Sequence, residues 1–167
     1  MTGSLEETND AYSIAKIAGA KMCMEYSKQY KLDYKTLMPA NMFGLNDNYD
    51  LNSSHFFPAL IKKIHMAKIK KEKNVTLWGN GKPKRELLYV EDFADACVFF
   101  MKKKTKESFI NIGSGVEKSI EQFAKYIMKK LKVNLKIKYD LSKPNGMQRK
   151  KLDLKIANKY GWKAKTK

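Results

Sequence analysis

The stretch Asn9–Lys21, NDAYSIAKIAGAK, decides how the rest of the chain is interpreted. It opens a run, residues 10–30, in which apolar residues recur at helical period with small alanine and glycine residues on one side. Tyr12 and Lys16 stand four positions apart, so a helix carries both on one face. A lysine ammonium beside a phenol favours the phenolate, which makes the tyrosine a usable proton donor and acceptor. The spacing alone fits a chance pair on an amphipathic helix equally well.

Beyond residue 30, strand patterns alternate with helical patterns, which predicts an α/β fold. A strand ending near Pro39 should be followed by an irregular loop to residue 54, with Ser54 capping the next helix. We expect further helices at 56–71, 90–103 and 119–133, strand-like runs on both sides of a Gly-Asn-Gly turn within 75–90, strands at 109–115 and 135–140, and a strand with a short helix at 151–162.

The net charge of +17 raises the possibility of a polyanion partner. Only Arg85 and Arg149 among the 34 basic residues are arginines, whereas nucleic-acid readers favour the two-pronged arginine side chain. We therefore expect no nucleic-acid partner, although an anionic nucleotide fits the charge. The sequence has no membrane-length apolar run and no secretion signal, and Cys23 and Cys97 lack metal or disulfide spacing. These features predict a soluble cytoplasmic protein with buried free thiols and no metal site.

Several segments resemble, in order, the extended short-chain dehydrogenase/reductase family of nucleotide-sugar epimerases and dehydratases. The resemblance covers residues 3–162 and is carried by YSIAKIAGAKMC (12–23), MPANMFGLNDNYDLNSSHFFPALIKKIH (38–65), LWGNGKPKRELLYVEDFADA (77–96), INIGSGVEKSI (110–120) and KPNGMQRKKLD (143–153).

The resemblance implies the C-terminal part of an NAD(P)-binding Rossmann-like fold together with a smaller α/β substrate-binding domain. Residues 1–55 would belong to the cofactor domain and residues 56–167 mainly to the substrate domain, with segments near 86–115 returning to the Rossmann sheet. The family's glycine-rich phosphate loop would lie before residue 1, so the chain is expected to be a fragment that is inactive alone.

The implied activity is an NADPH-dependent, two-step conversion of GDP-4-keto-6-deoxy-D-mannose to GDP-L-fucose, by 3,5-epimerisation and then 4-keto reduction. The implied partners are this GDP-sugar and a second copy of the chain, bound through the 10–30 helix. Three alternatives stay open: a family member acting on another nucleotide sugar, a binding or assembly fragment without turnover, and a polyanion binder with steep salt dependence.

The resemblance also implies roles for individual residues near the reacting carbon and the cofactor. Tyr12 would protonate the C4 oxygen. Lys16 would activate Tyr12 and bind the nicotinamide ribose. His55 would exchange protons at C3 and C5, for which an imidazole titrates in a suitable range, and would contact the cofactor. Without the resemblance, we would interpret His55 as a surface residue at the start of a helix. The loop along the cofactor would be Pro39, Ala40, Asn41 and Met42.

The substrate contacts implied by the resemblance spread over the second half of the chain. Lys63 stands where an arginine is usual, and Asn145 where an aspartate is usual, which changes the contact expected at each. Trp78 also reads as a core residue, and Arg85 as a solvated charge after a turn. The implied set is Lys63, Trp78, Arg85, Lys136, Asn145 and Lys150.

Residues 110–119, INIGSGVEKS, imitate a dinucleotide-binding turn because they run from a strand through Gly-x-Gly to a helix. Lys118 occupies the third glycine position, and no acidic residue follows at the required distance in a second strand. We therefore interpret this segment as a structural strand and turn.

Overall fold

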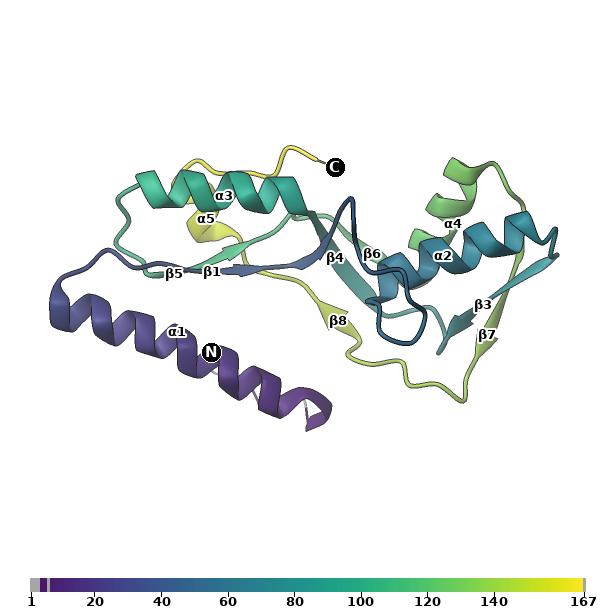
Figure 1. Ribbon diagram of the computed structural model, residues 1–167, viewed down its shortest axis with the longest axis horizontal. Helices are drawn as coiled ribbons and strands as arrows, with labels where there is room; N and C mark the ends of the chain where they lie inside the picture. Colours follow the sequence, from purple (N-terminus) through teal and green to yellow (C-terminus); the bar gives the residue numbers. More distant parts are fainter. Residues whose placement is uncertain (1–3, 6, 167) are drawn as a thin grey trace.

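Helices and strands alternate along the chain in the computed structural model, which describes residues 4–5 and 7–166 (Figure 1). The α/β class expected from the sequence is confirmed. The helices are a short 3-10 turn at Glu7–Asn9, α1 (Asp10–Tyr30), α2 (Phe56–Ile69), α3 (Val90–Lys102), α4 (Ile120–Leu131) and α5 (Lys155–Lys159). The strands are β1 (Thr36–Pro39), β2 (Asn41–Phe43), β3 (Asn74–Trp78), β4 (Lys84–Tyr89), β5 (Phe109–Ile112), β6 (Glu117–Ser119), β7 (Lys136–Asp140) and β8 (Arg149–Lys150).

Strand β4 is the hub of the strand pairing. It runs parallel to β2 and β8 and antiparallel to β6. Two parallel pairs, β1 with β5 and β3 with β7, lie toward the two ends of the molecule (Figure 1). Segments far apart in sequence therefore meet on β4, where Arg85 and Lys150 are register partners.

Two hydrophobic cores are joined through β4. Leu87 contributes to one core and Leu88 to the other, because successive side chains of a strand point to opposite faces. The first core lies among α2, α4, β3 and β7 and includes Leu60, Ile64, Val75, Leu77, Phe123 and Ile127. The second lies among α3, α5 and β5 and includes Ala96, Phe100, Ile110, Ile112, Ala157 and Trp162.

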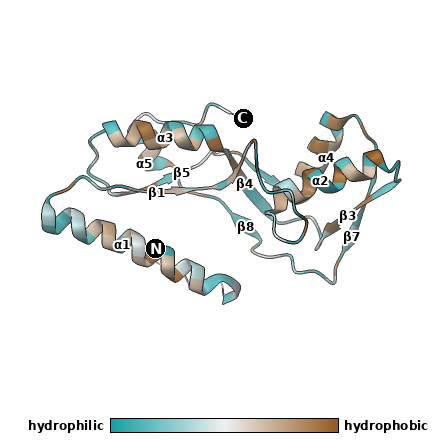
Figure 2. Cartoon of the chain, viewed as in Figure 1, coloured by the Kyte–Doolittle hydropathy of each residue, from teal (hydrophilic) through white to brown (hydrophobic). Residues whose placement is uncertain are grey.

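Helix α1 is packed far less than the other long helices. Ala20 is its one buried residue within the described part of the chain. Figure 2 shows hydrophobic and hydrophilic residues interspersed along it. Its large exposed side chains include Tyr12, Ile14, Met22, Tyr26 and Tyr30.

The last described residues are fixed to α3. The backbone N–H groups of Lys165 and Thr166 donate to the carboxylate of buried Asp92, at 3.2 and 3.0 Å. The Trp162 indole N–H donates to Asp95 at 3.1 Å. A carboxylate removed from water needs such donors, so this C-terminal contact stabilises the start of α3.

Some local predictions were wrong. Residues 41–43 form β2, where a loop was expected, because they pair with β4. His55, and not Ser54, is the N-cap residue of α2, and the Ser54 hydroxyl is buried without a hydrogen-bond partner in the described part of the chain. The strand expected just after residue 150 is instead the pair Arg149–Lys150.

Both cysteines are free but only partly buried, and not fully buried as expected. Burial raises the pKa of the Cys97 thiol, which disfavours the reactive thiolate. The thiols therefore suggest no chemistry of their own.

Candidate functional site

The Tyr-Lys pair forms as the spacing predicts. The Lys16 ammonium lies 5.3 Å from the centroid of the Tyr12 ring, and Tyr12 is 59% exposed. Both side chains project from α1 on one face, as residues four apart on a helix do. A phenol beside an ammonium, open to a ligand, is a reasonable arrangement for proton transfer.

A cavity of about 390 Å³ lies where the beginning of α1 meets β4 and the segment before β8. Arg85 and Lys150 both line it, and they are direct register partners on the parallel strands β4 and β8. The full lining is Ser4, Leu5, Asn9, Ser13, Arg85, Gly146, Met147 and Lys150. The cavity therefore brings two cations suited to an anionic group to α1, which contributes Ser13 to the lining but neither Tyr12 nor Lys16.

The guanidinium of Arg85 is held in place by the backbone. Its Nη1 donates to the carbonyls of Lys84 at 2.8 Å and Met147 at 2.7 Å. A Cβ at Gly146 would lie 3.4 Å from Nη2, and Gly146 has φ of +64°, so a glycine suits this close approach. Burial lowers the pKa of Arg85, but an arginine remains charged across the physiological range.

A second group of candidate residues surrounds Trp78 at the end of β3. The Lys63 and Lys143 ammoniums lie 4.8 and 5.7 Å from the centroid of the indole ring. Burial lowers the pKa of Lys63, and the charge of Asp140 opposes this. Because Trp78 is 57% exposed, it is not the core residue that the sequence also allowed. An aromatic surface flanked by cations can contact both a base and phosphates.

Asn145 fixes the loop before β8 to the Gly-Asn-Gly turn. Its Oδ1 accepts the N–H of Asn80 at 2.8 Å, and its side chain occupies the space where a Cβ at Gly79 would stand. The turn after Trp78 is thereby attached to the segment that carries the cavity residues. The predicted substrate position therefore also has a structural role.

The predicted cofactor segment, residues 39–42, crosses from β1 to β2. The N–H of Ala40 donates to the Ile112 carbonyl at 2.8 Å, and Asn41 Nδ2 donates to the Glu86 carbonyl at 3.2 Å. Pro39 ends β1, and Met42 is exposed within β2. These contacts hold the segment firmly at the carboxyl end of β1, where ligands bind in open α/β sheets.

His55 is exposed at the N-cap of α2 and, like Tyr12 and Lys16, is not among the residues lining the cavity. Lys136 begins β7, while Asp140 at the other end of that strand lies opposite Trp78. Four residue steps along a strand span ~13 Å, so the structure does not bring Lys136 to the Trp78 group.

Two residues that contribute to these contacts were missed in the sequence. Lys143 precedes the predicted Asn145 by two positions in the segment KPNG. Its short sequence distance from Asn145 could have identified it as a further candidate, and its ammonium does lie near Trp78. Glu86 follows Arg85 and is fully buried, which no local pattern indicated.

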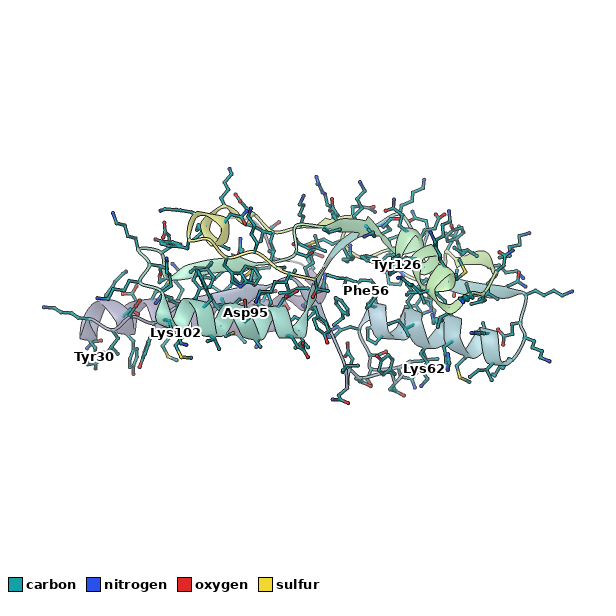
Figure 3. All side chains as sticks on the ribbon, turned by 90° about the horizontal axis from the view of Figure 1, so that it is seen from above. Tyr30, Phe56, Lys62, Asp95, Lys102 and Tyr126 are labelled. Carbon is teal, nitrogen blue, oxygen red and sulfur yellow. The ribbon has the colours of Figure 1, made fainter. Side chains whose placement is uncertain are left out.

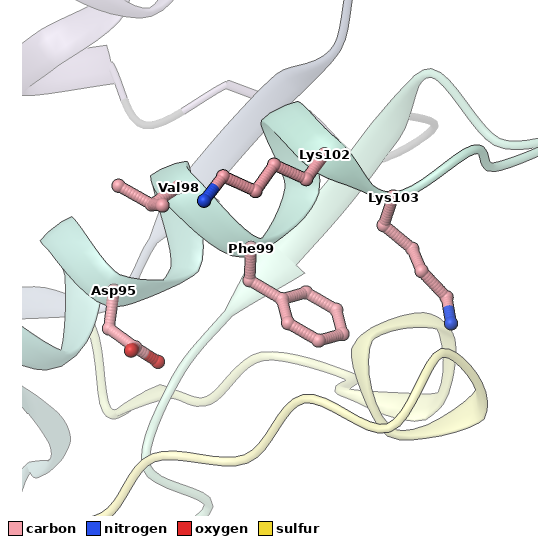
Figure 4. Close-up of a pocket in the computed structure, with 5 residues that line it drawn as sticks. All are labelled: Asp95, Val98, Phe99, Lys102 and Lys103. Carbon is pink, nitrogen blue, oxygen red and sulfur yellow. The ribbon is translucent and has the colours of Figure 1, made fainter.

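A hollow of about 330 Å³ on α3 contains none of the predicted residues. Figure 4 shows Phe99 pointing from α3 toward the C-terminal segment, with Asp95, Val98, Lys102 and Lys103 around it. Elsewhere, side chains with nitrogen tips project outward around the whole periphery (Figure 3). The lysines are therefore a dispersed surface charge.

Over residues 4–5 and 7–166, no three His, Cys, Asp or Glu side chains are grouped so that they could hold a metal ion. In the same ranges, none of the helices has both the length and the apolar character required to cross a membrane.

Comparison with known proteins places these features in a family. The profile of the NAD dependent epimerase/dehydratase family matches residues 1–113. GDP-L-fucose synthase from Sinorhizobium fredii (strain NBRC 101917 / NGR234) is 46% identical over 166 residues, which cover 99% of this chain and 53% of that protein. GDP-L-colitose synthase from Yersinia pseudotuberculosis is 40% identical over 167 residues, which cover 99% of this chain and 54% of that protein.

The fold has close counterparts among solved structures. A GDP-mannoheptose C4 reductase from Campylobacter jejuni, solved with NADP bound, superposes with a TM-score of 0.84 at 27% identity, covering 100% of this chain and 59% of that one. The chain spans about half the length of the curated relatives it matches. The α/β architecture is consistent with the C-terminal part of an extended short-chain dehydrogenase/reductase. The chain belongs to the NAD dependent epimerase/dehydratase family.

Proposed function

We propose that this chain supplies the catalytic tyrosine and the sugar-nucleotide site of an NADPH-dependent enzyme that converts GDP-4-keto-6-deoxy-D-mannose to GDP-L-fucose. The observation that carries the proposal is the cavity that joins the helix of Tyr12 and Lys16 to the cations Arg85 and Lys150. The relatives named GDP-L-fucose synthase support it.

In this proposal, the 4-keto group supports both steps. Protons on the carbons beside a ketone are acidified by it, so His55 can act as one acid/base group in the epimerisation at C3 and C5, with a second group on the opposite face of the sugar completing each proton exchange. Tyr12 then donates its phenolic proton to the C4 oxygen during reduction, and the Lys16 ammonium stabilises the phenolate that remains.

The diphosphate of the substrate requires positive charge with defined geometry. Arg85 presents a guanidinium whose orientation is set by two carbonyls, and Lys150 lies opposite it on β8. Lys63 and Lys143 flank the exposed face of Trp78, where a base or a sugar can pack. Lys63 keeps the charge of the usual arginine but loses its two-pronged geometry, so we expect a weaker grip on the diphosphate at that position.

The residues present fit a nicotinamide cofactor, which would supply a hydride when bound. Lys16 offers donors for ribose hydroxyls, and His55 would lie nearby. The segment Pro39–Met42 offers firmly held backbone along the end of β1. The family description supports a nicotinamide cofactor, and a related structure with NADP bound supports NADP in particular.

The proposal includes an assembly and a location. The exposed apolar side chains of α1 suit a homodimer formed through residues 10–30, and the enzyme would act in the cytoplasm without a nucleic-acid partner. Residues 1–55 would form part of the cofactor domain, and residues 56–167 mainly the substrate domain, with 86–115 returning to the cofactor sheet.

The test is an assay of the protein that contains this chain with GDP-4-keto-6-deoxy-D-mannose and NADPH. We expect NADPH oxidation and GDP-L-fucose as product, with UDP- and dTDP-linked 4-keto sugars as controls that react at least tenfold more slowly. Equal rates with the UDP sugar would favour a different nucleotide-sugar enzyme. Retention of GDP binding without turnover would favour a binding or assembly role.

A further inference from the structure

Glu86 is a buried carboxylate that receives backbone donors from two distant segments. It lies on β4 and is 0% exposed. Its Oε1 accepts the N–H of Gly115 at 2.7 Å, and its Oε2 accepts the N–H of Leu152 at 3.1 Å. Since a buried charge is costly unless it is hydrogen-bonded, both segments are fixed to β4 by this side chain.

The Gly-Ser-Gly turn after β5 is shaped around this carboxylate. A Cβ at Gly113 would collide with Glu86 Oε1, and Gly115 has φ of +75°, a conformation that favours glycine. The turn that resembles a phosphate-binding loop in sequence therefore binds an anion of the chain itself. Contact with Glu86 explains the glycine at position 113, and the left-handed backbone explains the glycine at position 115.

The other contact of Glu86 controls the segment that carries the cavity residues, here called the substrate segment (residues 145–152). Arg85 binds its Met147 carbonyl, and the Lys84 N–H donates to its Gln148 carbonyl at 2.9 Å. Beyond β8, the Leu152 N–H reaches Glu86. Lys150 thus lies between two attachment points, one through Arg85 and one through Glu86.

We infer that Glu86 is a positioning residue: by anchoring the substrate segment it sets Lys150 and Arg85 at the distance that an anionic diphosphate requires. This inference rests on the proposed function for the identity of the ligand. The cofactor segment is attached differently, because Asn41 binds the backbone carbonyl of Glu86 and not its carboxylate. A change of the side chain should therefore weaken substrate binding and spare cofactor binding.

The test uses Glu86→Gln in the protein that contains this chain. The glutamine keeps the shape but turns an amide NH₂ toward one of the two backbone donors, so one bond is lost. We expect the Kd for GDP, measured by calorimetry, and the KM for the GDP-sugar to rise about tenfold, with the KM for NADPH unchanged. Amide exchange at Leu152 or Gly115 should accelerate. Glu91→Gln, at an exposed glutamate on α3, is the matched control.

The outcomes separate positioning from general stability and from the proposed function. The positioning role is overturned if the KM for the GDP-sugar and the KM for NADPH rise equally, or if GDP affinity is unchanged in Glu86→Gln. If the wild-type protein does not bind GDP, the proposed ligand fails, while amide exchange still decides whether Glu86 anchors the segment. Should Glu86→Gln not fold, Glu86→Asp keeps the charge with a shorter reach, and the same selective rise in the KM for the GDP-sugar is expected.

Discussion

Helix α1 and strand β4 each carry part of the candidate site, but they are held in different ways. Of the 21 residues of α1, Ala20 is buried, whereas Glu86, Leu87 and Leu88 of β4 are buried in succession and the strand pairs with three others. The recognisable Tyr-Lys motif thus lies on the loosely packed element, and Arg85, a proposed substrate contact, lies on the firmly packed one. Tyr12 and Lys16 lie together because one helix carries both, whereas Arg85 and Lys150 lie together because two distant strands pair.

The largest expected effect tests α1 through its chemistry. Tyr12→Phe in the protein that contains this chain should reduce the rate of 4-keto reduction by about 10²–10⁴-fold, because the phenolic proton is lost. GDP affinity and unfolding free energy should stay within error, since Tyr12 is exposed. NADPH oxidation kinetics measure the rate of reduction, and calorimetry measures GDP affinity and unfolding. Comparable reduction rates would remove Tyr12 from the mechanism.

The second prediction tests the packing difference directly. Leu88→Ala should lower the free energy of unfolding by about 2–5 kcal/mol, because Leu88 is fully buried in the second core. Ile14→Ala should change the free energy of unfolding of the separated chain by less than about 0.5 kcal/mol, because Ile14 is exposed on α1. Urea titration of both variants at low protein concentration makes the comparison. At higher protein concentration the proposed homodimer would cover Ile14, so the loss for Ile14→Ala should then grow; a loss as large as that of Leu88→Ala at low concentration would contradict the packing difference.

The third prediction concerns the two arginines of the chain. Arg85→Lys removes the fork that binds the Lys84 and Met147 carbonyls, so we expect GDP affinity to fall about tenfold, or ~1.4 kcal/mol. Arg149→Lys is the matched control, because Arg149 is exposed, pairs with Glu117 and does not line the cavity. Calorimetric titration with GDP measures the affinity of both variants and of the wild type. Equal losses for both variants would indicate a general effect of charge.

The smallest expected effect concerns Glu107, which contacts Lys159 and Tyr160 near the C-terminal helix α5. Hydrogen bonds from Lys159 and Tyr160 lower the pKa of Glu107 from 4.5 to about 2. Because the folded pKa is depressed, this stabilisation is present above about pH 4.5 and is lost as the pH falls toward 2. The difference in unfolding midpoint between wild type and Glu107→Gln should therefore be positive at pH 6 and shrink by pH 3. A difference independent of pH would exclude the ionic contact as its source.

Sequence periodicity predicted the helices well, because their signals are local. Helix α1 spans residues 10–30 as expected, and α4 begins at a capping box in which Ser119 and Gln122 exchange hydrogen bonds. The pairing of β4 with β2, β6 and β8 depends on contacts between distant segments, so no local pattern announced β2. The same holds for Glu86, whose donors lie 29 and 66 positions away.

The candidate site was predicted in part. Tyr12 with Lys16, Arg85 with Lys150, and Lys63 with Trp78 do lie together, but their roles stay predictions. Lys136 lies apart from the Trp78 group because it stands at the opposite end of β7 from Asp140, the register partner of Trp78. Asn145 shows why residue type alone was insufficient: its amide oxygen is already bound to a turn that follows Trp78.

The contact of Asp92 with the last described residues has a practical meaning for anyone who handles this protein. Trimming the chain after Ala164 would remove both backbone donors and leave a buried carboxylate without its partners. Residues 165 and 166 therefore hold the beginning of α3, and any shortened version of this protein should keep both of them.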